Sequence, residues 1–497
     1  MADQEKAGQA ILRGARATAF GFAIRFGARL LFLFIAGRLF GATQFGAYLL
    51  AAAIVELAVS VGALSTKKTL FPLLDGHSGL GRRPGHIVAD AALLVGGFSA
   101  ALAAILMLTV GLLPASWLPP ATKTALILLA PMIVGQSLLD LVLAAARWKQ
   151  IVRYEVVSRS LIEPYAATLG AILAWAIGLR ETGLLFGYAF GTLAALAYAA
   201  WGTIRSYGGF HPAGYRPCTL VMKSILSSAG SNSAVDFLNA LYMRIDLYMV
   251  SLLLGEGPTG IYGMARQMTA PIRQVRQSFD GLLIPAVART LALRGSRETG
   301  EALARATRLI LILQLPILIA AVAAGAPLME WFGPGFSAGY WALVALAAAE
   351  VIQAAFSMGD LIFVYLKPRV GLRITLAGIL VGVAAALLLI PPFGITGAAL
   401  AVLIAYVVRA ALRVRELSRD FDVHVPLARH AGPLLAALAA CGTAIGLHAL
   451  GGLAPLRFDF LAFGGGLAVY AGAVWLWLRA RGESLSLTGF AAHPSGV

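Results

Sequence analysis

Seven arginines lie inside long apolar stretches of the chain, where charged side chains are uncommon. They are Arg25, Arg29, Arg38, Arg244, Arg266, Arg273 and Arg276. A charge at bilayer depth costs about 2.5–3.5 kcal/mol even on the mildest insertion scale, so each arginine needs a physical reason. Guanidinium groups bind phosphate oxygens through charge-assisted, often bidentate hydrogen bonds. These arginines therefore indicate binding of a phosphorylated group at membrane depth.

Helical spacing sorts these arginines into faces. At about 100° per residue, Arg266, Arg273 and Arg276 fall within an arc of about 80° on one helix. Arg25 and Arg29 are one turn apart on another helix and share a face. We predict a substrate-binding cavity that is lined by six residues: Arg25, Arg29, Arg266, Arg273, Arg276 and Gln277.

Some of these charges also have structural explanations. Arg38 stands near a helix end, from which its side chain can reach the membrane interface. Arg244 can pair with an acid of its own half of the chain. Arg276 and Asp280 are one turn apart and can neutralise each other.

Eight carboxylates also lie at membrane depth, so the interior is a mixed network of charges. They are Glu56, Asp140, Glu163, Asp236, Asp246, Asp280, Glu350 and Asp360. Intramembrane acids in transporters often bind Na⁺ or relay protons, and the alternative is pairing with arginine. The candidates for a coupling ion are Asp236, Asp246, Asp280, Glu163 and Glu56. Pro164 follows Glu163 and predicts a kink, because proline removes a backbone hydrogen bond. We expect no cofactor and no structural metal.

The elements that position these residues are transmembrane helices. Hydrophobic residues make up 59% of the chain and charged residues 12%, against about 45–50% and 25% in ordinary soluble domains. Apolar runs of about 20 residues, each long enough to cross the bilayer, recur along the sequence. In lipid such runs must be helical, because every backbone polar group needs an internal partner. The sequence predicts an all-α polytopic membrane protein.

Turn signals divide the apolar runs into fourteen predicted spans. Their approximate bounds are 18–40, 44–65, 86–113, 122–146, 157–178, 182–204, 229–254, 258–287, 306–331, 338–364, 371–391, 393–412, 430–450 and 459–479. With the N-terminus in the cytoplasm, 29 of the 39 Lys and Arg residues fall on the inner side, as the positive-inside rule requires. We therefore expect both termini to be cytoplasmic, with no cleavable signal peptide.

This topology accounts for the net charge of +16, so no nucleic-acid partner is needed, and attraction to anionic membrane lipids follows from it. The two cysteines allow neither a disulfide framework nor a metal cluster. No phosphate-binding loop for ATP occurs, and no soluble stretch is long enough for an enzyme domain.

A short motif occurs twice at a constant offset. Gly41, Gly46 and Tyr48 recur 214 residues later as Gly255, Gly260 and Tyr262, and Thr182-Gly183 recurs as Thr396-Gly397 at the same offset. The offset predicts two parallel six-helix repeats followed by two extra helices. The expected division is an N-terminal lobe at 1–210, a second lobe at 211–425, and a final helix pair with a short tail at 426–497.

Three stretches carry a resemblance to a known family. They read ARLLFLFIAGRLFGATQFGAYLLAAA at 28–53, RIDLYMVSLLLGEGPTGIYGMARQMTAPI at 244–272 and LLIPPFGITGAALAVLIAY at 388–406. Together with the span pattern they resemble the polysaccharide-export (Wzx-type) flippases of the multidrug/oligosaccharidyl-lipid/polysaccharide (MOP) superfamily. Fourteen spans with intramembrane arginines are also similar to the lipid II flippases, but their Ser-Arg signature near the first span is missing. The drug-exporting branch typically has twelve spans and fewer buried arginines.

The resemblance implies that a polyprenyl-diphosphate-linked oligosaccharide is moved from the cytoplasmic to the outer face of a bacterial inner membrane by alternating access. Polysaccharide polymerases or glycosyltransferases would be its partners. A cation-coupled multidrug antiporter on the same fold is the alternative. A membrane-embedded glycosyltransferase or polymerase is a third reading, although such enzymes usually have large outer loops, and every outer loop here is short.

Overall fold

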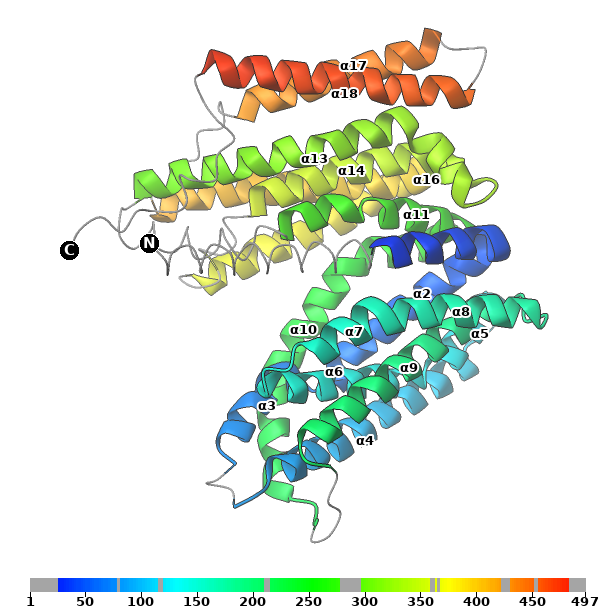
Figure 1. The fold of residues 1–497 in the computed structure, drawn as a ribbon, viewed down its shortest axis with the longest axis vertical. Helices are drawn as coiled ribbons and strands as arrows, with labels where there is room; N and C mark the ends of the chain where they lie inside the picture. Colours follow the sequence, from blue (N-terminus) through cyan, green and yellow to red (C-terminus); the bar gives the residue numbers. More distant parts are fainter. Residues whose placement is uncertain are drawn as a thin grey trace, which may run out of the picture. The chain divides into compact units, whose positions relative to one another are not determined.

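The structure is a computed structural model of the 497-residue chain. It describes residues 26–77, 81–114, 119–209, 215–277, 296–357, 363, 367–421, 430–450 and 455–481. Within these ranges the chain is helical and has no β-strand (Figure 1). The predicted all-α fold is therefore confirmed.

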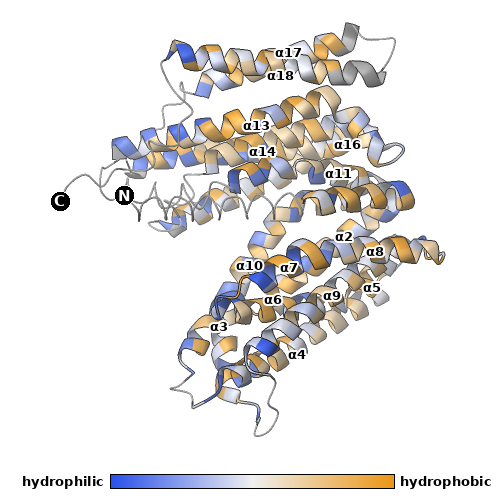
Figure 2. Cartoon of the chain, in the orientation of Figure 1, coloured by the Kyte–Doolittle hydropathy of each residue, from blue (hydrophilic) through white to orange (hydrophobic). Residues whose placement is uncertain are grey.

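Eight helical segments of the described ranges are long and apolar enough to cross a membrane, and a bent pair brings this to nine. Two of the eight, Phe26–Asp75 and Arg369–Arg419, each contain two predicted spans. Apolar residues run along most helices, whereas hydrophilic residues gather at helix ends such as the start of α13 (Ser296–Phe332) (Figure 2). The protein is thus a multi-pass membrane protein, and the fourteen predicted spans coincide with helices where the chain is described.

The chain forms two compact units. Unit 1 comprises Met1–Ser251 and Gly255–Gly260, and unit 2 comprises Leu252–Leu254 and Ile261–Val497. The expected lobes at 1–210, 211–425 and 426–497 stay a prediction.

The elements of unit 1 are η1 (Ala36–Phe40), α2 (Gly41–Gly62), α3 (Thr66–Asp75), α4 (Pro84–Leu112), α5 (Pro120–Leu129), α6 (Met132–Trp148), α7 (Arg153–Val157), η2 (Ser158–Ile162), α8 (Glu163–Ala176), α9 (Gly183–Ser206) and nearly all of α10 (Thr219–Leu254). Helix α10 begins ten residues before the predicted span at 229. Its early turns are anchored by apolar contacts, because Val221 and Ile225 share a buried cluster with Leu70 of α3.

Proline shapes two helices of unit 1. Helices α5 and α6 meet at Pro131 with a bend of 42° and together cover one predicted span. The kink predicted at Glu163-Pro164 takes the form of the π-helix η2, which ends directly before Glu163. Proline lacks the N–H that an α-helical turn would use here, and the π-turn lies directly before this break in the hydrogen-bond pattern.

The two copies of the Gly-x4-Gly-x-Tyr motif have similar backbone turns. Gly41 and Gly255 both have a positive φ, of 74° and 83°, with extended ψ values of 177° and −168°. Each turn precedes a helix, α2 in the first copy and α11 (Glu256–Met268) in the second. Local conformation thus repeats with the sequence, while the organisation of the complete repeats stays a prediction.

The starts of α2 and α11 touch each other at their glycines. A Cβ atom on Gly46 would lie 1.9 Å from the backbone oxygen of Glu256, and one on Gly260 would lie 1.9 Å from that of Ala42. The contact is reciprocal, because positions 42 and 46 recur 214 residues later as 256 and 260. The Glu256 carboxylate also accepts hydrogen bonds from the backbone and hydroxyl of Thr122, at 2.7 and 2.6 Å. Only glycine permits this approach of two backbones.

The elements of unit 2 are the rest of α11, then α13 (Ser296–Phe332), η3 (Phe336–Gly339), α14 (Tyr340–Phe356), α16 (Pro368–Phe421), α17 (Ala431–Leu450) and α18 (Pro455–Ala480). The 54-residue α16 is two helices joined at Gly394, whose φ is 57°, after Pro391 and Pro392. This break falls between the predicted spans 371–391 and 393–412. The final pair packs on α13, where the Tyr470 hydroxyl donates to the Ile312 carbonyl at 3.0 Å.

Candidate functional site

Unit 1 contains a polar cavity of about 420 Å³. Six helical segments supply its walls: α2, the start of α3, α6, η2 with α8, α9 and α10. The lining residues are Glu56, Val59, Ser60, Ala63, Ser65, Thr66, Lys67, Lys68, Gln136, Asp140, Arg159, Glu163, Tyr188 and Asp236. Half of these side chains are charged, which is unusual for the interior of a membrane protein.

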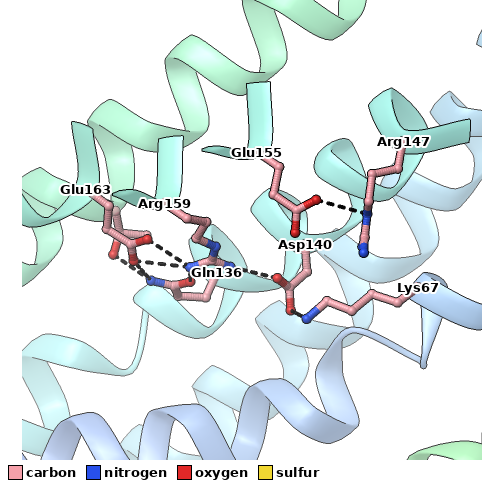
Figure 3. Close-up of polar contacts among 8 residues, drawn as sticks. Lys67, Gln136, Asp140, Arg147, Glu155, Arg159 and Glu163 are labelled. Atoms are coloured by element: carbon pink, nitrogen blue, oxygen red, sulfur yellow. Dashed lines mark hydrogen bonds and ion pairs between the residues drawn. The ribbon is translucent and has the colours of Figure 1, made fainter. Parts of the chain in front are cut away.

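Arg159, in η2, is the centre of the hydrogen-bond network in this cavity (Figure 3). Its guanidinium donates to Asp140 on α6 at 2.7 Å and to Glu163 on α8 at 3.0 Å. Gln136 closes the ring, because its oxygen accepts from Arg159 at 2.8 Å and its amide donates to Glu163 at 2.8 Å. The planar guanidinium can hold both carboxylates at once, which a lysine could not do in the same geometry.

Two lysines at the start of α3 extend this network. The Lys67 ammonium lies 2.9 Å from the second oxygen of Asp140, so Asp140 is shared between Lys67 and Arg159 (Figure 3). The Lys68 ammonium donates to Asp236 on α10 at 2.7 Å, and the Ser65 hydroxyl donates to the other oxygen of Asp236 at 2.7 Å. The lysine side chains are 53% and 51% exposed, so water can reach both ammonium groups.

Glu56 on α2 is the fourth acid of the cavity, and Arg244 on α10 donates to it at 2.6 Å. Four carboxylates are therefore matched by four cations: Lys67, Lys68, Arg159 and Arg244. An anion that enters this cavity meets cations already held by acids, and it can bind by taking over some of these pairs. Ion pairs of exposed lysines contribute little on their own, so exchange of Lys67 and Lys68 is energetically accessible.

The predicted arc of span 8 lies in unit 2 and is separate from this cavity. Arg273 forms an ion pair with Glu350 on α14, whose side chain is only 6% exposed. Arg266 lies in the last turn of α11, and Arg276 and Gln277 follow in the next turns, with Gln277 exposed. The pair with a buried carboxylate indicates a structural role for Arg273, while the substrate-binding role of this arc stays a prediction.

The other predicted site residues fall at several places. Glu56, Glu163 and Asp236, proposed as coupling-ion ligands, all line the unit 1 cavity. Asp246 is buried on α10 and does not line that cavity. Arg29 is half-buried in the first described helix. Arg25 and Asp280 lie outside the described residues.

The expectation for Arg244 is corrected by the structure. Its acid partner is Glu56 on α2, within the first expected lobe, and not an acid of its own half. A second side-chain contact also joins α10 to α2, because the Tyr248 hydroxyl donates to the Ala53 carbonyl at 2.9 Å.

The sequence analysis missed Lys67, Lys68, Arg159 and Gln136 as members of the site. The three cations were counted as loop charges, because they stand near the ends of apolar runs. A usable signal was present in the stretch LSTKKTL at 64–70, where Ser-Thr at the start of a helix precedes two lysines.

The helix arrangement matches the fold of solved flippases and transporters of the MOP superfamily. The lipid II flippase MurJ in an inward closed conformation has a TM-score of 0.76 to this chain at 14% identity, covering 93% of this chain and 99% of MurJ. A multidrug resistance MATE family transporter in an inward-facing conformation has a TM-score of 0.64 at 11% identity, covering 80% and 98% of the two chains. The superfamily resemblance is confirmed at the level of the fold.

Among curated proteins, the chain is similar to the probable low-salt glycan biosynthesis flippase Agl15 of Haloferax volcanii. The two are 20% identical over 318 residues, which is 63% of this chain and 65% of that protein. No known family profile matches the chain. The similar proteins are flippases and transporters, and none of them is described as an enzyme.

Proposed function

We propose that this protein moves a polyprenyl-diphosphate-linked oligosaccharide from the cytoplasmic to the outer face of a bacterial inner membrane, with both termini in the cytoplasm. The observation that supports this most is the unit 1 cavity, where exposed ammonium groups and a guanidinium are held by exchangeable acids. Such a cavity suits a polar, anionic head group while the isoprenoid tail stays in lipid. The likeness to a lipid II flippase and to a glycan biosynthesis flippase points the same way.

Alternating access is the transport mechanism that this proposal includes. The cavity would accept the head group from one side, and the glycine contact between α2 and α11 would close the other. Protons or Na⁺ would couple through the carboxylates of Glu56, Glu163 and Asp236, with Asp246 and Asp280 as further candidates. Polymerases or glycosyltransferases would supply the cargo or consume it.

Reconstitution into liposomes tests this proposal directly. A fluorescent lipid-linked oligosaccharide is placed in both leaflets, and the fraction that an impermeant quencher reaches is followed over time. We expect the protein to speed the exchange between leaflets, and Arg159→Gln to slow it. Arg153→Gln is the matched control, because Arg153 is exposed six residues earlier and does not line the cavity. Equal exchange with and without protein would refute the proposal.

A cation-coupled multidrug antiporter is the second candidate, and one observation favours it. The cavity lining itself has four carboxylates and three cations, so an organic cation could replace Lys67 or Lys68 as the partner of Asp140 or Asp236. The test is the uptake of a fluorescent cationic dye into the same liposomes under a proton or Na⁺ gradient. Gradient-driven dye uptake without movement of the lipid-linked oligosaccharide would favour the antiporter.

A further inference from the structure

The turn between α2 and α3 has an uncommon backbone. Leu64 and Ser65 both have a φ of 49°, in the left-handed region that residues other than glycine rarely occupy. Two such residues in succession persist only where the surroundings hold them in place. Leu64 is fixed in a buried apolar cluster, and Ser65 bonds to Asp236 and lies 3.3 Å from the Ser233 hydroxyl. This turn brings four successive residues, Ser65 to Lys68, to the cavity wall.

The start of α3 lacks the usual means of stabilising a helix N-terminus. Ser65 occupies the N-cap position, but its side chain makes no capping hydrogen bond to the helix. The first turn holds no acidic residue and instead contains Lys67 and Lys68. Cations at this end oppose the helix dipole, whereas an anion there would be favoured by both the dipole and the lysines.

Thr66 supplies an independent observation at the same place. The residue is fully buried and lines the cavity. Among the described residues, no hydrogen-bond partner is found for its Oγ1 atom. A buried hydroxyl without a partner is costly and calls for an explanation, and an oxygen-rich ligand in the cavity would supply the partner.

We propose that the first turn of α3 is a phosphate-binding site for the pyrophosphate of the lipid-linked cargo. The Thr66 hydroxyl would donate one hydrogen bond, and Lys67 and Lys68 would move from Asp140 and Asp236 onto the phosphate oxygens. Asp140 would keep Arg159 as its partner, and Asp236 would keep the Ser65 hydroxyl. Neither carboxylate would be left without a hydrogen bond. This inference rests on the proposed function and names the group of the cargo that the site binds.

Binding to the purified full-length protein in nanodiscs tests the site. Calorimetric titration at low salt uses inorganic pyrophosphate and farnesyl diphosphate as probes. We expect Thr66→Val to weaken binding about tenfold, since one hydrogen bond to a charged group is lost. Lys67→Gln and Lys68→Gln should each weaken it by a similar factor. Thr69→Val and Lys223→Gln are matched controls on α3 and α10 that do not line the cavity, and they should bind like the wild type.

The acidic partners give a test in the opposite direction. Asp236→Asn and Asp140→Asn release Lys68 and Lys67 from competing carboxylates, so both variants should bind pyrophosphate more tightly than the wild type. A purely structural role for these pairs would not tighten binding. Unchanged affinity in both Thr66→Val and Asp236→Asn would overturn the proposal, and thermal unfolding of each variant verifies that it is folded.

Two further experiments identify which molecule supplies the bound phosphate and test pyrophosphate binding separately from transport. The protein should bind farnesyl diphosphate with the same affinity in nanodiscs that contain phosphatidylglycerol and in neutral nanodiscs. Full competition by phosphatidylglycerol would overturn the assignment to the cargo in favour of a phospholipid head group. The liposome exchange assay measures transport and is interpreted separately from the binding data. Loss of exchange in Thr66→Val with normal exchange in Thr69→Val supports the site, whereas failure of exchange in the wild type counts against the proposed function and not against pyrophosphate binding.

Discussion

The contact between Gly46 and Glu256 can be tested by adding a single methyl group. In Gly46→Ala the new Cβ atom would meet the Glu256 oxygen at 1.9 Å and the Gly260 nitrogen at 2.8 Å, both of them backbone atoms. A side chain could rotate away, but a backbone cannot, so the starts of α2 and α11 must separate by about 1 Å or more. Overpacking of this kind costs about 1–3 kcal/mol.

This cost applies only to the state in which the two turns touch. It therefore lowers the population of the closed contact about 5- to 150-fold relative to a state in which they are apart. Because the contact is reciprocal, Gly260→Ala should have an effect of the same size. Gly97→Ala is the matched control, since Gly97 lies on α4 and a Cβ there would have no atom within 4 Å.

The assay is the rate of crosslinking between Gln44→Cys and Thr259→Cys, with one or two neighbouring pairs on each side included. The two native cysteines, Cys218 and Cys441, are first replaced by serine. We expect the rate to fall at least fivefold in Gly46→Ala and to stay unchanged in Gly97→Ala, and the crosslink to stop transport reversibly. Equal crosslinking and transport in Gly46→Ala and the wild type would show that this contact does not form during transport.

Three further predictions follow from the charges and the topology. Arg159→Ala should destabilise the protein by about 1–3 kcal/mol, because Asp140 and Glu163 lose their shared partner and keep only Lys67 and Gln136. Adding Asp140→Asn and Glu163→Gln should restore most of the thermal stability, and an unchanged stability of the single variant would contradict this. Arg273→Ala should lower stability by removing an ion-pair partner of the buried Glu350 carboxylate, while Arg273→Ala with Glu350→Gln should be stable but inactive in transport. Normal transport by the double variant would exclude a cargo contact for Arg273. Cysteines at positions 43, 117 and 257 should react with an impermeant label from outside, and those at 75, 296 and 420 only after permeabilisation; one outside-reactive site among the last three would refute the fourteen-span topology.

The helices could be located from sequence because the bilayer leaves few alternatives. A run of about 20 apolar residues can satisfy its backbone in lipid only as a helix, so hydropathy alone located the segments. Helix α16 contains two predicted spans, and the break between them was visible in the sequence as Pro391, Pro392 and Gly394. The bounds of α10 were less predictable, because its first ten residues are held by contacts with α3 and not by their own hydropathy.

The cavity was harder to predict, since it depends on which helices are neighbours. Lys67 and Asp140 are 73 residues apart in sequence, and Lys68 and Asp236 are 168 apart. Hydropathy places a charge along the membrane normal, but it does not tell which charges from distant helices face one another. Glu56, Glu163 and Asp236 were singled out because acids at membrane depth are rare. Lys67, Lys68 and Arg159 were not, because cations near helix ends are common.

The π-helix η2 also limits how the Arg159 network can change. A π-turn holds one residue more than an α-turn of the same pitch, and the surplus residue cannot be removed by stretching the helix. The surplus residue can only shift into the next turn of the helix. Each such shift rotates the side chains that follow by about 100° relative to those before it. Arg159 lies within η2 and Glu163 directly after it. If the π-turn moved past Glu163, that side chain would rotate away from Arg159, so this ion pair depends on where the π-turn lies.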